Sequence, residues 1–311
     1  MTQGAPLPDA DAVIRAVGPW SHRDVSANGC RFHVVEAGEG PAVVLLHGFP
    51  TFWWTWRAHL PALAASGYRV IAMDLRGYAG SDHPPQGYDP RTMAADVAGV
   101  IRSLGESDAV VVGHGWGGIA AWSAAVLHPE AVRAIASVAM PHPRALRSAL
   151  LRDRKQRAAM RYALGFQLPF LPERRLGSHD GNRVGELLRS WSQDTSWATD
   201  ELLAEFQCAF LRWPTAHTAI EYHRWAVRSA LRPDGHAYMS LMEAPLRQSV
   251  LHIHATGDPM ILPTSAEGTA EYVRGEYARV DIDCGHFVHE EKPAEFQRTL
   301  MTWLDTVHGR A

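Results

Sequence analysis

The stretch Val110-Val111-Val112-Gly113-His114-Gly115-Trp116-Gly117-Gly118 is an apolar run that changes abruptly into small residues. Ile119-Ala120-Ala121-Trp122 follows directly and begins a helical pattern. Glycines two positions before and two positions after Gly115 allow a strand and a helix to pack closely while the central residue stands at the apex of the turn. The stretch therefore predicts a buried strand, a sharp turn at Gly115 and a helix.

Short, almost continuously apolar runs recur on both sides of this stretch. Strands that are apolar on both faces and alternate with helices indicate a parallel sheet covered on both sides. Ligands of such sheets bind outside the carboxyl ends of the strands. We therefore predict an α/β fold with a mostly parallel, twisted sheet. The predicted strands are residues 42–46, 68–73, 109–112, 134–139, 249–255 and 278–282, and the predicted helices between the early ones are 53–65, 91–104 and 116–128.

Two segments depart from this alternation. Residues 21–40 predict a hairpin, with a strand over 31–35 and a turn over 36–41. From Pro141 to about Pro245 the sequence has Arg-rich and Trp-rich amphipathic stretches that are broken by proline and glycine, a pattern typical of several helices. We expect a core formed by residues 1–140 and 246–311, and a helical cap over residues 141–245 inserted between its two parts.

The composition limits the classes of partner. The chain has 311 residues, a net charge of −3 and an apolar fraction of 46%, as in ordinary globular domains. No basic face is available for nucleic acid, and no window has the roughly 18 apolar residues of a membrane span. Three widely spaced cysteines and the lack of a signal peptide pattern favour the cytoplasm, without a disulfide framework, metal or cofactor. The cysteines are Cys30, Cys208 and Cys284.

Two polar motifs follow late strands and share the predicted carboxyl edge with Gly115. Asp258 lies in Thr256-Gly257-Asp258-Pro259, and His286 lies in Cys284-Gly285-His286-Phe287. A carboxylate can hold an imidazole in one tautomer and leave its other nitrogen free to take a proton from water. Each residue alone fits a turn cap or a loop histidine equally well. Together with the sharp turn at Gly115, which we call the elbow, they favour a catalytic pair.

The motifs resemble those of the α/β-hydrolase superfamily, in particular epoxide hydrolases and the related haloalkane and haloacetate dehalogenases. The resemblance covers nearly the whole chain, from His47-Gly48-Phe49-Pro50 through residues 73–82 and the elbow to Gly285-His286. It implies an α/β-hydrolase fold with an inserted helical cap. In this family the elbow carries an aspartate nucleophile, where this chain has Gly115. The resemblance also implies an oxyanion hole made by the backbone N–H groups of Phe49 and Trp116, which needs no side chain at position 115.

The cap decides between epoxide hydrolases and dehalogenases, because epoxide hydrolases place two cap tyrosines over the pocket. Tyr162 falls on the first of these positions, and His223 falls on the second. Tyr222 precedes His223 and would point about 100° away on a helix. A histidine can still donate a proton, so we expect His223 to act as the second donor. The alternative is that Tyr162 and His223 only pack within the cap.

Gly115 leaves three interpretations open, since glycine has no atom that attacks carbon. The chain is an enzyme in which His286 and Asp258 activate water or a substrate hydroxyl, a binding protein without turnover, or an epoxide hydrolase that has lost its aspartate. A cyclase or lyase and a dehalogenase-like protein also remain open. A pocket near His47 with a Trp-rich mouth predicts a small apolar or aromatic substrate, and a homodimer is left open. The mouth is predicted from Trp53, Trp54 and Trp116, and the expected substrate contacts are His47, Trp53, Trp54 and Tyr222.

Overall fold

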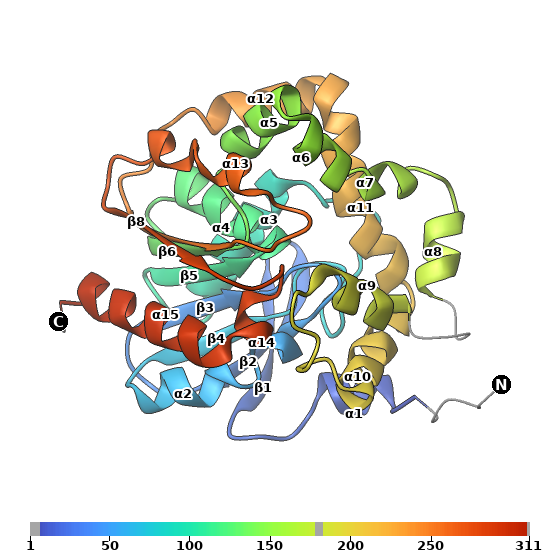
Figure 1. The fold of residues 1–311 in the computed structure, drawn as a ribbon. Helices are drawn as coiled ribbons and strands as arrows, with labels where there is room; N and C mark the ends of the chain where they lie inside the picture. Colours follow the sequence, from blue (N-terminus) through green and yellow to red (C-terminus); the bar gives the residue numbers. More distant parts are fainter. Residues whose placement is uncertain (1–6, 178–182, 310–311) are drawn as a thin grey trace.

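The structure is a computed structural model, and it describes residues 7–177 and 183–309. An eight-stranded sheet forms its centre, in the order β1-β2-β4-β3-β5-β6-β7-β8. β1 and β2 run antiparallel to their neighbours, and β3 to β8 are parallel, which confirms the predicted α/β-hydrolase fold (Figure 1). The strands are β1 (Ser21–Ala27), β2 (Cys30–Ala37), β3 (Ala42–Leu46), β4 (Arg69–Met73), β5 (Ala109–His114), β6 (Val132–Val138), β7 (Ser249–Ala255) and β8 (Tyr277–Ile282).

The first hairpin turns at a different place from the one predicted. β1 and β2 pair from Ser21 with Glu36 to Ala27 with Cys30, so the turn is Asn28-Gly29. Both turn residues have positive φ, 45° and 73°, as tight two-residue hairpin turns require. Residues 38–41, in the segment expected to form the turn, instead connect β2 to β3. The turn prediction was therefore wrong, because the Asn-Gly signal was overlooked.

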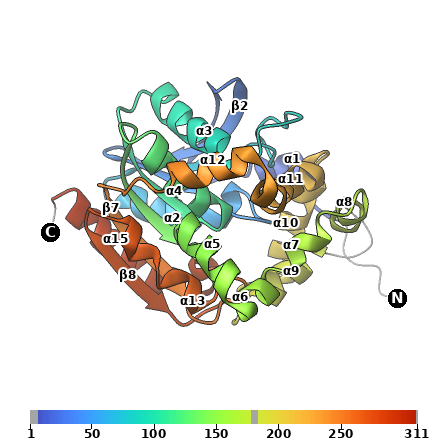
Figure 2. The ribbon, with the colours of Figure 1, turned by 90° about the horizontal axis from the view of Figure 1, so that it is seen from above.

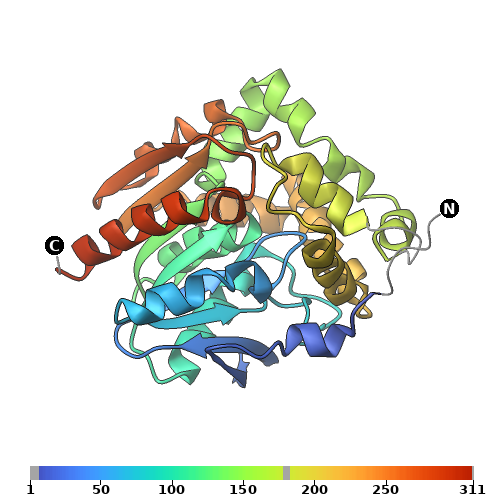
Figure 3. The same cartoon turned by 60° about the horizontal axis from the view of Figure 1, so that its bottom comes forward.

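Helices cover both faces of the sheet. α3 packs beside α4, and α15 packs beside α2, and the two pairs lie on opposite faces (Figure 3). All five residues of β3 and all six of β5 are buried, which explains their almost uninterrupted apolar sequence. The helices of this layer are α2 (His59–Ala65), α3 (Pro90–Ser103), α4 (Trp116–Leu127) and α15 (Pro293–Val307). The shorter elements are α1 (Ala10–Ile14), η1 (Trp53–Trp56), α13 (Pro263–Ala266), η3 (Thr269–Tyr272) and α14 (Val288–Glu291).

Between β6 and β7 the chain forms helices that arch over the carboxyl edge of the sheet (Figure 2). Asp153 ends the first of them in an extended conformation, and its carboxylate then accepts a hydrogen bond from the N–H of Lys155 and caps the next. The cap helices are α5 (Pro143–Arg152), α6 (Arg154–Ala159), α7 (Tyr162–Gly165), α8 (Leu171–Leu176), α9 (Arg183–Trp191), α10 (Asp200–Leu211), α11 (Thr215–Arg228), η2 (Ser229–Leu231) and α12 (Pro233–Leu241). No helix within the described ranges is long and apolar enough to cross a membrane.

Helix α11 fastens the cap to the core. The hydroxyl of Tyr222 donates a 2.6 Å hydrogen bond to the carbonyl of Arg76, and the hydroxyl of Thr218 donates one of the same length to the carbonyl of Gly77. Tyr222 is completely buried in this contact and does not line the cavity described below. The prediction that Tyr222 binds substrate was therefore wrong, and its side chain holds α11 on the loop after β4.

Candidate active site

The turn between β5 and α4 has the strained geometry expected of an elbow. Gly115 lies at φ 53° and ψ −117°, a backbone conformation that side chains with a Cβ rarely adopt. A Cβ on Gly113 would collide with the backbone of Gly117. The close packing of β5 against α4 therefore requires glycine at position 113. A Cβ on Gly115 would meet ordinary contacts only, 3.5 Å from Nε2 of His286 and 3.6 Å from Cα of Gly48. The side-chain direction at position 115 therefore points at His286.

His286 and Asp258 form a buried pair beside this turn. Nδ1 of His286 lies 2.7 Å from Oδ2 of Asp258, and the residues are 5% and 3% exposed. The other oxygen, Oδ1, accepts hydrogen bonds from the N–H groups of Met260 and Ile261 at 2.7 and 3.0 Å. Because a carboxylate oxygen only accepts, Nδ1 of His286 carries the proton. Nε2 has no protein partner among the described residues and faces the elbow.

The backbone of His286 is fixed on two sides. Its N–H donates to the carbonyl of Trp191 at 2.8 Å, and its carbonyl accepts the Nε2–H of His114 at 3.0 Å. His114 is the residue before Gly115 and is completely buried, and burial lowers its pKa, so that the ring stays neutral. This contact joins the elbow to the loop after β8, which carries His286. The sequence analysis missed His114, although its position next to the elbow could have suggested a positioning residue.

His47 is buried in the loop after β3 and does not line the cavity. Its Nδ1 lies 3.0 Å from the carbonyl of Gly48, and its Nε2 accepts the N–H of Leu75 at 3.0 Å. The ring is completely buried, which lowers its pKa, and it does not line the cavity. The prediction of His47 as a substrate contact was therefore wrong. The bond from Leu75 holds the loop that carries Phe49 against the loop after β4, and the contact with Gly48 lies within the loop of His47 itself.

The backbone N–H groups of Phe49 and Trp116 have no protein acceptor within the described part of the chain. Phe49 follows β3, and Trp116 is the first residue of α4, so that both lie at the carboxyl edge of neighbouring strands. Both residues line the same cavity as Gly115 and His286. The cavity is thus lined by two residues whose N–H groups lack a protein acceptor in the described ranges, and by one imidazole with a nitrogen that lacks a protein partner there.

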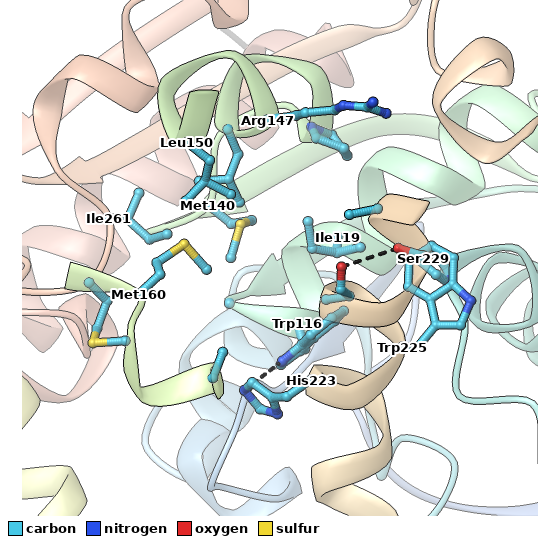
Figure 4. Close-up of a pocket in the computed structure, with 18 of the residues that line it drawn as sticks. Trp116, Ile119, Met140, Arg147, Leu150, Met160, His223, Trp225, Ser229 and Ile261 are labelled. Atoms are coloured by element: carbon cyan, nitrogen blue, oxygen red, sulfur yellow. Dashed lines mark hydrogen bonds between the residues drawn. The ribbon is translucent and has the colours of Figure 1, made fainter. Parts of the chain in front are cut away.

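The cavity between core and cap has a volume of about 440 Å³, enough for a small organic molecule. Its wall is almost entirely apolar, and Arg147 is the one residue with a permanently charged side chain among those that line it (Figure 4). The apolar wall includes Met140, Leu146, Leu150, Met160, Trp191, Met260 and Ile261. Leu231, which is 91% exposed, lies on the cap side of the mouth. The lining predicts an apolar ligand.

Of the three tryptophans expected at the mouth, only Trp116 lines the cavity. The indole N–H of Trp53 donates to the carbonyl of Ile14 at 2.9 Å, and that of Trp54 donates to Glu205 at 2.7 Å. The prediction that Trp53 and Trp54 bind substrate was therefore wrong. Two cap residues, Trp191 and Trp225, line the cavity in their place. Neither lies in a motif, so no sequence signal distinguished them from other cap tryptophans.

Tyr162 of α7 lines the cavity, and its hydroxyl has no protein hydrogen-bond partner in the described ranges. Burial, followed by the negative charge of Asp258, raises the pKa of the Tyr162 hydroxyl, so that it keeps its proton at neutral pH. The ring packs edge to face against Trp191 and His223, at centroid distances of 5.2 and 5.6 Å. Tyr162 is therefore a free hydrogen-bond donor in an apolar surrounding.

His223 lines the cavity, but its nitrogens are occupied. The indole N–H of Trp116 donates to Nε2 of His223 at 3.1 Å, and Nδ1 lies 3.3 Å from the carbonyl of Ala219 (Figure 4). The proton therefore lies on Nδ1. Burial lowers the pKa of His223 to about 3, so that the ring is neutral near pH 7. The prediction that His223 donates a proton to a substrate conflicts with these contacts, because its only proton faces the backbone of its own helix.

The chain belongs to the α/β hydrolase fold family, whose sequence profile matches residues 41–293. It is 31% identical to epoxide hydrolase A of Mycobacterium tuberculosis, covering 93% of this chain and 98% of the relative. It is also 31% identical to bifunctional epoxide hydrolase 2 of Sus scrofa over 89% of this chain, but spans only 54% of that protein. The crystal structure of epoxide hydrolase A from Mycobacterium thermoresistibile superposes with a TM-score of 0.78 and 29% identity, covering 92% of this chain and 98% of the other. The predicted likeness to epoxide hydrolases is confirmed.

Proposed function

We propose that this protein opens small apolar epoxides by direct attack of water. The observation that carries the proposal is the free Nε2 of His286, which faces the turn at Gly115 inside an apolar cavity. Asp258 holds the opposite nitrogen at 2.7 Å, so that the ring presents a lone pair to the cavity. The likeness to epoxide hydrolases supports the substrate class.

In the proposed reaction a water molecule beside Gly115 accepts a hydrogen bond from the N–H of Trp116, which leaves the second lone pair of its oxygen free. The water oxygen bonds to an epoxide carbon while one of its protons passes to Nε2 of His286. The carbon–oxygen bond of the ring breaks, and the epoxide oxygen takes the proton of the Tyr162 hydroxyl. His286 then returns its proton through solvent to Tyr162. The balance is one epoxide and one water converted to one diol, without an enzyme ester.

Asp258 orients His286 and stabilises its cation during the reaction, a role that an amide cannot fill. The cap contributes Tyr162 as a single proton donor, since His223 is engaged by Trp116. The hydrogen bond from Trp116 to His223 leaves the cap with one proton donor fewer. This observation favours the second candidate function, a protein that binds apolar ligands without turnover. A pocket that only binds has no need of the buried pair of His286 and Asp258, and we therefore prefer the hydrolase.

Heavy-oxygen water separates the candidate mechanisms. Styrene oxide is offered to an excess of protein in H₂¹⁸O, and the diol of the first turnover is analysed by mass spectrometry. Direct attack of water gives a diol labelled from the first turnover, whereas an enzyme ester would first deliver unlabelled oxygen from the protein. His286→Ala serves as the control. If a panel of aryl and alkyl epoxides gives no diol while the protein still binds apolar ligands, the proposed hydrolase function is wrong and the binding-protein function is supported.

A further inference from the structure

We propose that the space beside Gly115 also binds a carboxylate ion, and that this carboxylate attacks the epoxide in place of a protein side chain. The inference rests on the proposed function for its second step, the attack, but not for its first, the binding. It assigns to this chain a ligand class, a small carboxylate, and a product class, the hydroxyalkyl ester.

Three residues with a hydrogen-bonding group that lacks a protein partner in the described ranges line the cavity beside Gly115: Phe49, Trp116 and His286. Trp116 is the first residue of α4, so that its N–H lies at the N-terminus of a helix of twelve residues. The aligned peptide dipoles of a helix favour negative charge at its N-terminus. The N–H of Phe49 comes from the neighbouring loop. The second, independent observation is His286, which is 5% exposed and whose Nε2, without a protein partner among the described residues, lies 3.5 Å from the Cβ position of Gly115. When protonated, this nitrogen donates to an anion.

The surrounding charges are compatible with an anion. Neither aspartate nor glutamate lines the cavity in the described part of the chain, and its one permanently charged side chain is the guanidinium of Arg147. Asp258 lies behind the imidazole of His286, hydrogen-bonded to Nδ1, and stabilises the cation that would face the anion. A carboxylate that binds together with one proton, which Nε2 of His286 takes up, gives the order carboxylate, imidazolium and carboxylate.

The part of the cavity next to Gly115 is bounded by Nε2 of His286 and Cα of Gly48. Apart from its chain neighbours, two heavy atoms lie within 4 Å of the Cβ position of Gly115, at 3.5 and 3.6 Å, so that one side-chain atom fits there in ordinary contact. The atoms of a free ion stay at least a van der Waals distance of roughly 3.5 Å from the Cα of Gly115, whereas the Cβ of a side chain is bonded to that Cα and lies much closer. Formate can take this position with its carbon near that limit, but the methyl group of acetate needs additional space. We therefore expect formate to bind more tightly than acetate.

The chemical step balances without an oxidant or reductant. A carboxylate oxygen bonds to an epoxide carbon, the ring carbon–oxygen bond breaks, and the released alkoxide takes a proton from the Tyr162 hydroxyl. The product is a hydroxyalkyl formate, and Tyr162 regains its proton from solvent. Water activated by His286 can then hydrolyse this ester to diol and formate. Some epoxides carry a carboxylate of their own, whose oxygen lies four or five bonds from an epoxide carbon. Such a substrate would give a hydroxylactone by the same step, with no water consumed.

Binding is tested first, and without turnover. Saturation-transfer NMR with ¹³C-formate measures formate binding to the wild-type protein and to Gly115→Asp, which places a carboxylate at the same position. We expect saturable binding to the wild type in the range of roughly 10 to 100 mM, weaker binding of acetate, and at least a tenfold loss in Gly115→Asp. Gly115→Ser is the second variant if Gly115→Asp does not fold. Equal formate binding to the wild type and to a folded variant would overturn the site.

Turnover is tested second, with styrene oxide, formate and a sodium chloride control of equal ionic strength. We expect the rate of epoxide opening to rise at least tenfold and to saturate with formate, and ¹⁸O from labelled formate to enter the product. A 4,5-epoxy acid offered alone distinguishes the other source of the carboxylate, through a hydroxylactone. Formate that binds without changing the rate or label of an active wild type would overturn the nucleophile. Formate that binds to a protein which opens no epoxide would instead overturn the proposed hydrolase and leave the carboxylate site standing.

Discussion

The indole N–H of Trp116 donates a hydrogen bond of 3.1 Å to Nε2 of His223, and this contact joins the first turn of α4 to α11 of the cap. It crosses the cavity wall directly beside the turn at Gly115. The hydrogen bond fixes the imidazole in the neutral tautomer and removes its proton from the cavity. The cap and the elbow are thereby held in one arrangement by two groups that each line the ligand space.

His223→Phe should remove the acceptor and leave the indole N–H of Trp116 unpaired in an apolar surrounding. We expect the free energy of unfolding to fall by about 1–3 kcal/mol, measured by urea denaturation. His223→Gln is the matched control, because its carbonyl oxygen can still accept this hydrogen bond, and it should lose less. Equal losses in both variants would show that ring packing, and not the hydrogen bond, stabilises this contact.

His286→Ala and Asp258→Asn should each lower the rate of epoxide opening by about 10²–10⁴-fold, as expected for a general base and its orienting group. Asp258→Asn should retain the hydrogen bonds from Met260 and Ile261, so that its fold is the better preserved of the two. Single-turnover rates and circular dichroism spectra provide the measurements. Unchanged rates in both folded variants would exclude the pair from catalysis.

Tyr162→Phe should lower the same rate by about 10²-fold or more while the stability changes little. The reason for this separation is that the hydroxyl has no protein partner in the described ranges, so that its removal leaves nothing unpaired. The measurements are the rate of diol formation and the urea midpoint. A large loss of stability with an unchanged rate would assign the hydroxyl to packing and not to proton donation.

Gly115→Asp should introduce a carboxylate that points at Nε2 of His286, since the Cβ position already lies 3.5 Å from that nitrogen. We expect an enzyme ester on reaction with styrene oxide, detected by mass spectrometry of the protein, and a rate above that of the wild type. The positive φ of 53° should lower the free energy of unfolding by roughly 1–3 kcal/mol. A stable variant without ester would mean that the pocket no longer presents the epoxide carbon to this position.

Acidification should destabilise the fold. Burial lowers the pKa of His142, His223 and His252 to about 3 in the folded protein. Between the unfolded pKa near 6.5 and this value the unfolded chain binds more protons, so that stability is present above pH 6.5 and is lost as the pH falls. Each of the three histidines should cost about 2 kcal/mol between pH 7 and pH 5. Urea denaturation at these two pH values, with His252→Gln as a variant that should lose less on acidification, checks the expectation.

The sequence predicted the parts of the fold that depend on periodicity and order along the chain. The runs at 42–46 and 249–255 coincide with β3 and β7, because strands buried on both faces admit almost only apolar residues. Asp258 and His286 meet because parallel strands bring their carboxyl ends to one edge. The contact between these two side chains was therefore predictable from the position of each motif after its strand.

The orientation of aromatic side chains was not readable in this way. Trp53 and Trp54 follow the loop of Phe49, yet their indoles turn to Ile14 and Glu205, which lie 39 and 151 residues away in the sequence. Tyr222 and His223 are neighbours on α11, and only one of them faces the cavity. Which face of a cap helix meets the ligand depends on how the cap packs on the core, and that packing rests on contacts between distant segments.

The elbow and its histidine are separated by a long stretch of chain. His114 and the carbonyl that it holds at residue 286 lie 172 positions apart, and β6 acquires its neighbour β7 only after the whole cap. At a synthesis rate of roughly 5–20 residues per second, a ribosome releases the elbow roughly 10 to 30 s before the loop that carries His286. During that interval the cap is synthesised, and the edge of β6 that later pairs with β7 stays unpaired. The reactive pair therefore assembles late in synthesis, and until then the unpaired edge of β6 is open to pairing with other chains.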